Sequence, residues 1–331
     1  MKVSKYVKIN EVNDFCFVVV SFKQEKYVIV HLESIKYLIE KYGTNKKIQL
    51  IFSDDSSTDN TVSFAKQWIE SNNNLFNEYE IVEHPSNVGT IRNMIDSINC
   101  VNATTFKLLS CDDLYYKNNI FELSQFNKVV FTPSIHFFEN GEIVRDMNIS
   151  YKKMFLAQHA GSVKKTIRKM LQYNNCIEAP GAFVPLEIWR DENFQHFLKQ
   201  YKYIEDILEW HYIFNHLYDE ISVEIIDRPY VLYRRNVGVS TSIKRKCSPI
   251  DNEYKQIRQS IPVKQDLFPK YVNFYRYINF LNEKYCNYIF GNKSHYKEIR
   301  DRWENEIKDV NNHLRRIEEA AKESYERVIG K

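Results

Sequence analysis

The sequence contains little glycine and little proline, eight of each among 331 residues, and it has no internal repeat or low-complexity segment. Its six cysteines include no pair at CxxC spacing, which argues against zinc or thioredoxin-like chemistry and suits a reducing cytoplasm. The net charge of +3 gives no general basis for binding nucleic acid, so we expect no nucleic-acid partner.

Long apolar runs are absent as well. Residues 1–14 lack the apolar core of a secretory signal, and no run approaches the ~18 residues that a membrane span needs. We therefore expect a cytoplasmic protein, for which contact with the inner face of the cell membrane stays open. Aromatic residues, by contrast, make up 15% of the chain, which reflects either a biased genome or a need for faces that stack on bases or sugars.

The first half of the chain alternates apolar, strand-like runs with helical patterns. Continuous β-branched runs such as FCFVVV are typical of buried parallel strands. The pattern predicts a doubly wound α/β fold with a mixed, mostly parallel sheet and helices on both faces. The expected strands are 15–20, 48–53, 78–84 and 105–110, and the expected helices are 25–42 (ending at Gly43), Thr58 or Asp59 to about 70, and 90–100.

The second half has a looser pattern. Residues 128–144 are expected to form a hairpin with its turn at Asn140-Gly141. Beyond it we expect, in order, a basic amphipathic helix, a strand, a helix, a strand and a helical C-terminal extension: 161–173, 176–184, 201–217, 221–236, and 264 to the end.

Two features of the C-terminal extension leave alternatives open. Apolar residues from Trp303 to Val328 recur at alternating spacings of four and three, which predicts a helical seam used either in a homodimer or for packing on its own domain. Residues 271–290 are rich in aromatic side chains. Together with the basic stretches 164–169 and 244–246, they indicate either contact with a membrane interface or core packing.

Polar loops directly follow four of the expected strands, at 21–25, 54–60, 85–92 and 111–113. In doubly wound sheets, ligands bind beyond the carboxyl ends of the strands. We therefore expect these loops to gather at one edge of the sheet and to form the binding site there.

Two of these loops open with paired carboxylates. Asp112 and Asp113 repel each other unless a cation or donors compensate, and such hard oxygen ligands suit Mg²⁺ or Mn²⁺ bound with substrate phosphates. The alternative is a helix N-cap. Asp54 and Asp55 either form turns and caps or accept the ring N–H of a uracil or thymine base.

Four segments, read in order, carry a resemblance. An apolar strand with a polar turn (VVVSFKQE) precedes a strand with a D-D-x-S-x-D-x-T loop (DDSSTDNT). An N-x-G segment with an Arg-bearing helix (NVGTIRN) and a strand with an acidic end (SCDD) follow. In order, spacing and strand context, residues 15–125 resemble the nucleotide-binding half of glycosyltransferase family 2, and the likeness continues more loosely to 245.

The resemblance implies a GT-A fold, a nucleotide-diphosphate sugar donor (UDP in preference to dTDP), and Mn²⁺ or Mg²⁺ as cofactor. It divides the chain into a catalytic domain at 1–245, with a nucleotide-sugar half at 1–125 and an acceptor half at 126–245, and a helical region at 246–331. By the same resemblance, the nucleotide sugar is contacted by nine residues: Ser21, Glu25, Asp54, Asp55, Asn87, Arg92, Asp112, Arg234 and Arg235.

The resemblance also implies individual roles. Asp54 and Asp55 match the carboxylates that read the base, Glu25 matches an acidic position near the ribose, and Arg92 matches a polar position beside the nucleotide. The metal ligands that it implies are Asp112 and Asp113. The chain departs from the family pattern where Ser110 replaces the first Asp of the acidic motif, Cys111 replaces a Gly, and Asn236 replaces a frequent His.

YIEDILEWH, residues 203–211, resembles the family's Glu-Asp motif at the start of a helix. The resemblance implies that Asp206 is the general base of an inverting transfer and that Glu205 is its neighbour. Taken alone, acidic residues in a first helical turn are also explained by the helix dipole. APGAF falls where the family approaches the acceptor, and Gly181 would let a ligand lie against the backbone.

The implied function is transfer of one sugar at a time to a glycan or lipid-linked oligosaccharide in surface polysaccharide synthesis, since no Q-x-x-R-W signature of processive synthases is present. Two alternatives stay open. One is a sugar-phosphate nucleotidyltransferase, although SFKQE lacks the glycine-rich phosphate loop usual in that class. The other is a non-catalytic nucleotide- or glycan-binding module, which the missing first Asp at Ser110 would fit.

Overall fold

The computed structural model describes residues 1–8, 11–123, 128–159, 163–171, 177–237, 249–261 and 293–330. Its main sheet has the strand order β1-β4-β3-β2-β5, in which every pair is parallel except β1 with β4. The strands are β1 (Lys2–Val7), β2 (Asn13–Ser21), β3 (Ile48–Asp54), β4 (Glu78–Glu83) and β5 (Ala103–Ser110). The doubly wound sheet is thus confirmed, and the antiparallel edge strand β1 is an addition that the sequence pattern did not predict.

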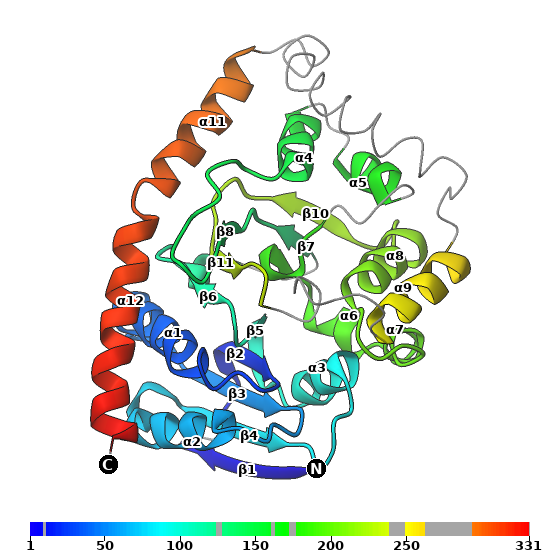
Figure 1. Cartoon of the computed structure of the whole chain (residues 1–331). Helices are drawn as coiled ribbons and strands as arrows, with labels where there is room; N and C mark the ends of the chain where they lie inside the picture. Colours follow the sequence, from blue (N-terminus) through cyan, green and yellow to red (C-terminus); the bar gives the residue numbers. More distant parts are fainter. Residues whose placement is uncertain are drawn as a thin grey trace.

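Helices cover both faces of this sheet (Figure 1). Side chains alternate along β2, so that Phe15 and Phe17 join the core beneath α1 (Val28–Tyr42) and α2 (Thr61–Ser71), while Cys16 and Val18 join the core beneath α3 (Thr90–Asn99). The backbone N–H of Gly43 bonds to Ile39 O and ends α1 as predicted. A short 3-10 turn, η1 (Asn73–Leu75), leads from α2 towards β4.

The second half forms two small three-stranded sheets, β10-β7-β9 and β6-β11-β8. Their strands are β6 (Leu114–Tyr115), β7 (Lys128–Phe131), β8 (Ile135–Phe137), β9 (Ala182–Phe183), β10 (Ser222–Ile225) and β11 (Val231–Arg234). The expected hairpin at 128–144 is confirmed for residues 136–144, where Phe138 N bonds to Glu142 O and Val144 N bonds to His136 O, but β7 joins a different sheet. Its turn at Asn140-Gly141 is present, with Gly141 at φ 80° and a single bridge between Phe137 and Ile143.

Short helices surround these sheets. They are η2 (Ile120–Glu122), α4 (Ile149–His159), α5 (Val163–Leu171), η3 (Ala179–Gly181), α6 (Leu186–Arg190), α7 (Glu192–Leu198), α8 (Asp206–His216) and α9 (Pro249–Ser260). In Figure 1, α8 and α9 lie next to each other on the right, above α3. The predicted basic amphipathic helix is therefore present as α5, and the helix predicted at 201–217 begins later, at Asp206.

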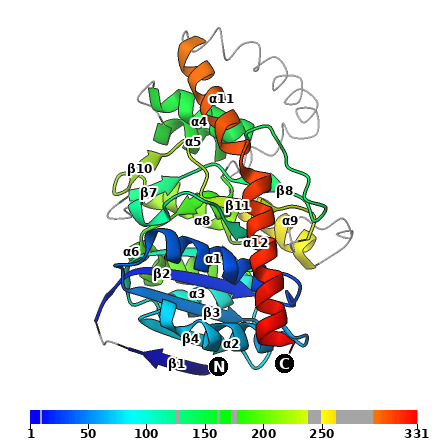
Figure 2. The same cartoon turned by 90° about the vertical axis from the view of Figure 1, so that its left-hand side faces the viewer.

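The C-terminal helices run along one side of the whole molecule (Figure 2). α11 (Lys293–Ile307) contacts α4, α12 (Val310–Ser324) contacts α1, and the π-helical turn η5 (Tyr325–Ile329) contacts α2. The predicted seam is buried against these elements, at Trp303, Val310, Leu314, Ile317, Ala321 and Ser324. The seam therefore packs on its own chain, and a homodimer through the C-terminal helix stays a prediction.

Several expectations fall outside the described residues: the aromatic segment 271–290, the basic stretch 244–246, the side chain of Val328, and Cys176, Cys247 and Cys286. Of the other cysteines, Cys16 and Cys111 are buried free thiols and Cys100 is a partly buried one. Among the described residues, no helix combines the length and the apolar character that a membrane span requires.

Candidate functional site

The strands β2, β3 and β5 end side by side. In the parallel register, Ser21 pairs with Asp54 and Val20 pairs with Ser110. The polar loops that follow these strands therefore lie on one edge of the sheet, as the sequence predicts.

Asp54 holds the turn that follows β3. Its carboxylate is buried and accepts hydrogen bonds from Ser21 Oγ (2.9 Å), from Ser57 N (2.7 Å) and from Ser57 Oγ (2.6 Å). The structure thus brings Ser21 and Asp54 together, but each is engaged by protein groups. Their part in contacting a nucleotide stays a prediction.

Asp55 links this turn to the loop before α3. It is 3% exposed, and it accepts the backbone N–H groups of Val88 (2.6 Å) and Gly89 (2.9 Å). Burial raises the pKa of Asp55, an effect that these two hydrogen bonds only partly offset. Asn87 Nδ2 lies 3.4 Å from Asp55 O. Two of the predicted nucleotide contacts, Asp55 and Asn87, therefore connect the loop after β3 with the loop before α3.

Glu25 and Arg92 do not line the cavity of about 390 Å³ that contains the acidic turn after β5. Glu25 accepts bonds from Asn60 N (3.0 Å) and Asn60 Nδ2 (3.2 Å), and it lines a separate open hollow of about 590 Å³ beside η5. Arg92 Nε donates to both carboxylate oxygens of Asp96 on an exposed face of α3. The structure therefore does not bring these two predicted contacts to the cavity that Asp112 and Asp113 line.

The acidic turn after β5 is buried and braced. Ser110 Oγ donates to Asp112 Oδ1 at 2.5 Å, and the backbone N–H of Arg234 donates to Asp113 Oδ1 at 2.8 Å. Burial, and then the charge of Asp112, raises the pKa of Asp113 well above its usual range. Strand β6 follows at Leu114, so the alternative of a helix N-cap at this pair is wrong.

The two neighbouring arginines have different positions. The Arg234 guanidinium is buried between the rings of Tyr27 (4.6 Å) and Phe137 (4.5 Å), and its Nε donates to Asp112 O at 2.8 Å. Burial lowers the pKa of Arg234. Arg235 lines the cavity, next to the ring of Tyr233. Arg234 thus braces the acidic turn, while Arg235 faces the space where a ligand would lie.

A second acidic pair lies at the start of α8. Glu205 precedes the helix, and Asp206 is its first residue, with Oδ1 accepting Ile207 N at 2.7 Å. Burial, and then the charge of Asp206, raises the pKa of Glu205. The helix N-terminus favours a negative charge at Asp206.

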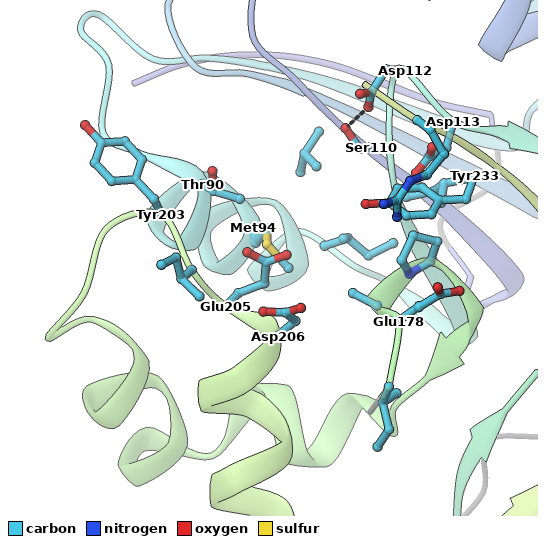
Figure 3. Close-up of a pocket in the computed structure, with 18 of the residues that line it drawn as sticks. Thr90, Met94, Ser110, Asp112, Asp113, Glu178, Tyr203, Glu205, Asp206 and Tyr233 are labelled. Carbon is cyan, nitrogen blue, oxygen red and sulfur yellow. Dashed lines mark hydrogen bonds between the residues drawn. The ribbon is translucent and has the colours of Figure 1, made fainter. Parts of the chain in front are cut away.

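One cavity of about 390 Å³ is lined by both acidic pairs and by Arg235 (Figure 3). Asp112 and Asp113 lie on one wall, and Glu205 and Asp206 lie on the opposite wall. Further lining residues include Thr90 and Met94 on α3, Asn148 and Ser150 at the start of α4, Ile177 to Pro180 beside η3, and Ile250 and Tyr254 on α9. The cavity therefore lies between the end of β5, α3, the start of α8 and α9.

A model described as Glycosyl transferase family 2 matches residues 16–181. The chain belongs to this family. The match contains the carboxylates of both loops, at Asp54, Asp55, Asp112 and Asp113, and it ends before Glu205 and Asp206. The fold, rather than the matched segment, brings the second acidic pair to the family's acidic turn.

Solved structures with this fold include S. aureus TarS. TarS 1–349 in complex with UDP-GlcNAc has a TM-score of 0.50 at 15% identity, over 74% of this chain and 65% of that one. The complex of TarS 1–349 with UDP has a TM-score of 0.47 at 17% identity, and the match covers 67% of this chain and 60% of that structure. No curated protein matches the sequence. The family match and the shared architecture confirm the GT-A fold expected from the sequence.

Family 2 enzymes commonly use a divalent cation, and the acidic turn offers a partial set of ligands for one. The described residues contain no cluster of three or more His, Cys, Asp or Glu side chains that could hold a metal. Asp112 and Asp113 both line the cavity, and Mg²⁺ is often bound by one or two carboxylates together with substrate phosphates. The turn therefore fits a cation that arrives with the donor.

The role expected for Gly181 is corrected. A Cβ at this position would lie 2.0 Å from Thr132 O and 2.8 Å from Tyr151 Oη. Gly181 is buried and its carbonyl accepts the N–H of Thr132 at 2.8 Å. The missing side chain thus allows η3 to pack on β7, and it does not open the backbone to a ligand.

The sequence reasoning missed Lys107, which lies behind the site. This lysine is 3% exposed in the middle of β5, and its Nζ donates to Ala182 O (2.6 Å) and Ala179 O (3.3 Å). Burial lowers the pKa of Lys107 to about 7, against the opposing charges of Glu209 and Asp113. A lysine between Phe106 and Leu108 in an apolar strand is the signal that could have revealed it.

Proposed function

We propose that this family 2 protein transfers one sugar residue from a nucleotide-diphosphate sugar to a hydroxyl group of a glycan or lipid-linked glycan, with inversion at the anomeric carbon. One observation carries the proposal. The acidic turn after β5 and the acidic pair at the start of α8 face each other across a single cavity. Inverting transfer needs a leaving-group side and a base on the opposite side of the sugar.

The donor we propose carries UDP. Support comes from the shared fold of the TarS structure solved with UDP-GlcNAc, and from the Asp54 and Asp55 loops at the carboxyl edge of the sheet. Arg235 is the cationic side chain that lines the cavity among the predicted phosphate contacts. A divalent cation held at Asp112 and Asp113 would neutralise the charge of the diphosphate as it leaves.

In the proposed reaction, the acceptor oxygen attacks the anomeric carbon while the bond from that carbon to the diphosphate breaks. The proton of the acceptor hydroxyl passes to the Asp206 carboxylate. Burial and the charge of Asp206 raise the pKa of Glu205, so the Glu205 carboxyl favours the neutral form, and Asp206 is the base that we propose. Glu205 therefore supports the base without competing with it.

Helix α5 supports a lipid-linked acceptor at a membrane surface. It exposes Lys165, Arg168 and Lys169, while Ile167 is buried against the domain. Such a helix is attracted to anionic headgroups. We place the reaction at the cytoplasmic face of the membrane, where buried free thiols such as Cys16 and Cys111 would remain reduced.

A donor screen followed by turnover measurements tests the proposal. We expect one UDP-sugar with Mn²⁺ to raise the melting temperature and to be consumed with release of UDP. Asp206→Asn should keep its affinity for UDP and lose about 100-fold or more in turnover, and Glu205→Gln should lose less. Asp112→Asn should lose about 100-fold in cation-dependent turnover.

The matched control is Asp96→Asn, because Asp96 pairs with Arg92 on α3 away from the cavity. Its turnover should equal that of the wild type. No stabilisation by any nucleotide sugar and no release of UDP would reject the proposal. A product with retained anomeric configuration would remove Asp206 from the mechanism.

A further inference from the structure

A carboxylate from a distant helix holds the segment that leads into α8. Glu253 on α9 is 8% exposed, and its oxygens accept three consecutive backbone N–H groups. Lys202 N donates to Oε2 at 2.9 Å, and Tyr203 N and Ile204 N each donate to Oε1 at 2.7 Å. A run of amides that converges on one acceptor has a fixed backbone conformation, because each amide would otherwise lose its partner on burial.

The same segment is held from its other side by the loop before α3. Lys202 O accepts the N–H of Ile91 at 3.2 Å, and Lys202 Nζ lies 3.4 Å from Asn87 O. Gly89 packs so closely here that a Cβ would lie 2.6 Å from Lys202 O. Since Asp55 holds the amides of Val88 and Gly89, the segment packs on a loop that is itself fixed by a buried carboxylate, while Glu253 of α9 holds it from the other side.

The acidic pair depends on this arrangement, because Glu205 and Asp206 directly follow Ile204 in the chain. α9 also contributes Ile250 and Tyr254 to the cavity wall, whereas Glu253 is not among the lining residues. Glu253 therefore contacts the segment and not the space for substrate. Its helix lies beyond the matched segment 16–181, so the family match does not account for it.

We propose that Glu253 is a positioning residue for sugar transfer: its carboxylate fixes the Lys202–Ile204 backbone so that Asp206 faces the acidic turn across the cavity. The inference rests on the proposed function, because it gives Asp206 the role of base. Small displacements of a catalytic group cost large factors in rate, so a side chain that fixes the base contributes to turnover without touching substrate.

The first test detects this clamp without any reaction. In the full-length chain without ligands, Glu253→Gln places an amide group where two acceptor oxygens stood, so one N–H loses its acceptor. We expect hydrogen–deuterium exchange in the peptide covering 201–206 to become about 10-fold faster. The control is Ile257→Val, which removes a buried methyl group from the same helix and should leave this peptide protected. Unchanged exchange in Glu253→Gln would overturn the clamp.

The second test measures turnover. Glu253→Gln should lower kcat about 10-fold or more and leave the Kd for UDP within about 2-fold, since the acidic turn is unaltered. In the Asp206→Asn background, the same change should lower kcat by less than about 2-fold, because no base remains to be positioned. Wild-type kcat in Glu253→Gln, or a loss equal to that of Ile257→Val, overturns the positioning role. A wild-type chain that transfers no sugar rejects the proposed function, and the exchange experiment still decides the clamp.

Discussion

At the scale of single residues, Lys107 is the least expected feature of the site. A lysine side chain that is buried in a strand loses its hydration, and here two carbonyl groups and the ring of Phe183 replace water around its Nζ. Those carbonyls belong to Ala179, which lines the cavity, and to Ala182, the first residue of β9. Lys107 thus ties the wall to the central sheet while it keeps a titratable group close behind the acidic turn.

The lowered pKa of Lys107 predicts a specific dependence of stability on pH. Its pKa is about 7 in the folded chain and about 10.4 in an unfolded one, so between these values the unfolded chain binds more protons. The contribution of Lys107 to the free energy of unfolding should therefore become more favourable as pH rises from 7 towards 10, and it should not vary below pH 7. Urea unfolding of the wild type and Lys107→Met at several pH values checks this. A difference between the two proteins that stays constant from pH 7 to 9 would contradict it.

At the scale of elements, the loop before α3 connects the two halves of the cavity. Gly89 has φ 89° and ψ 164°, a region that only glycine occupies readily. Its lack of a side chain also allows Lys202 to pack against the N-terminus of α3. One backbone position therefore determines how closely the segment that carries the acidic pair approaches the nucleotide half.

Gly89→Ala should lower the free energy of unfolding by about 3 kcal/mol, from backbone strain together with the collision at Lys202 O. Gly141→Ala is the matched control, because Gly141 has φ 80° and no atom within 4 Å of the added Cβ. Its cost should be about 1 kcal/mol, from the backbone term alone. Urea titrations give both values. An equal loss of unfolding free energy in both variants would show that Lys202 moves away from the added Cβ at no measurable cost.

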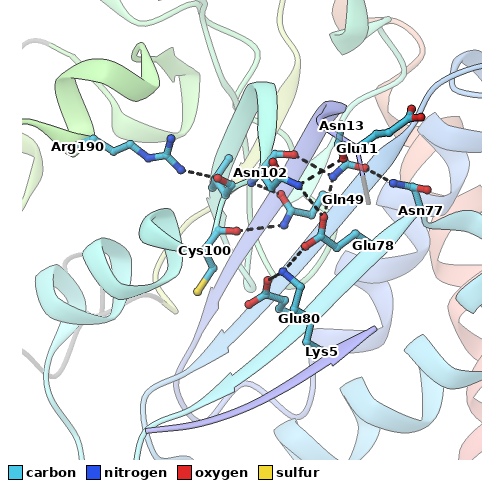
Figure 4. Close-up of polar contacts among 11 residues, drawn as sticks. Lys5, Glu11, Asn13, Gln49, Asn77, Glu78, Glu80, Cys100, Asn102 and Arg190 are labelled. Atoms are coloured by element: carbon cyan, nitrogen blue, oxygen red, sulfur yellow. Dashed lines mark hydrogen bonds and ion pairs between the residues drawn. The ribbon is translucent and has the colours of Figure 1, made fainter. Parts of the chain in front are cut away.

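At the scale of the whole molecule, segments from both ends of the chain pack on the main sheet and its helices. The C-terminal α12 packs on α1, where the buried Glu33 accepts hydrogen bonds from Trp68 Nε1 and Ser324 Oγ. At the N-terminus, β1 extends the sheet, and Lys5 lies between the buried carboxylates of Glu78 and Glu80 (Figure 4). Hydrogen bonds from Asn13 and Asn102 to Glu78 extend this network to the start of β2 and β5.

Lys5→Met should destabilise the fold at neutral pH by about 1 to 2 kcal/mol, because two buried carboxylates lose their cation while Lys5 itself is half exposed. Although burial opposes it, hydrogen bonding to Lys5 and the two asparagines lowers the pKa of Glu78. The stabilisation that corresponds to the lowered pKa of Glu78 is present above the unfolded pKa of about 4.3, and it is lost as the pH falls below that value. The effect of Lys5→Met should therefore shrink in acid. Lys2→Met is the control, since Lys2 is largely exposed and lies 3.9 Å from Glu83.

The sequence alone was enough to predict the central sheet, because the continuous apolar runs of β2 and β3 and the helical spacing of α1 are local properties of short segments. It was also enough to place the loops at one edge, because parallel strands connected by helices end together. The strand β1 could not be predicted this way. Its residues are mostly exposed, and only pairing with β4 makes it a strand.

Tertiary structure alone decided which loop side chains meet. Arg234 and Arg235 are neighbours in the sequence, yet one is buried between two rings and the other lines the cavity. Glu25 and Arg92 carry suitable charges and lie away from that cavity, while Glu253, which no motif marks, holds the segment before the acidic pair. The physical reason is that a side chain in a loop takes its direction from contacts with segments far away in the sequence, whereas a side chain in a regular strand takes it from the repeat of the backbone.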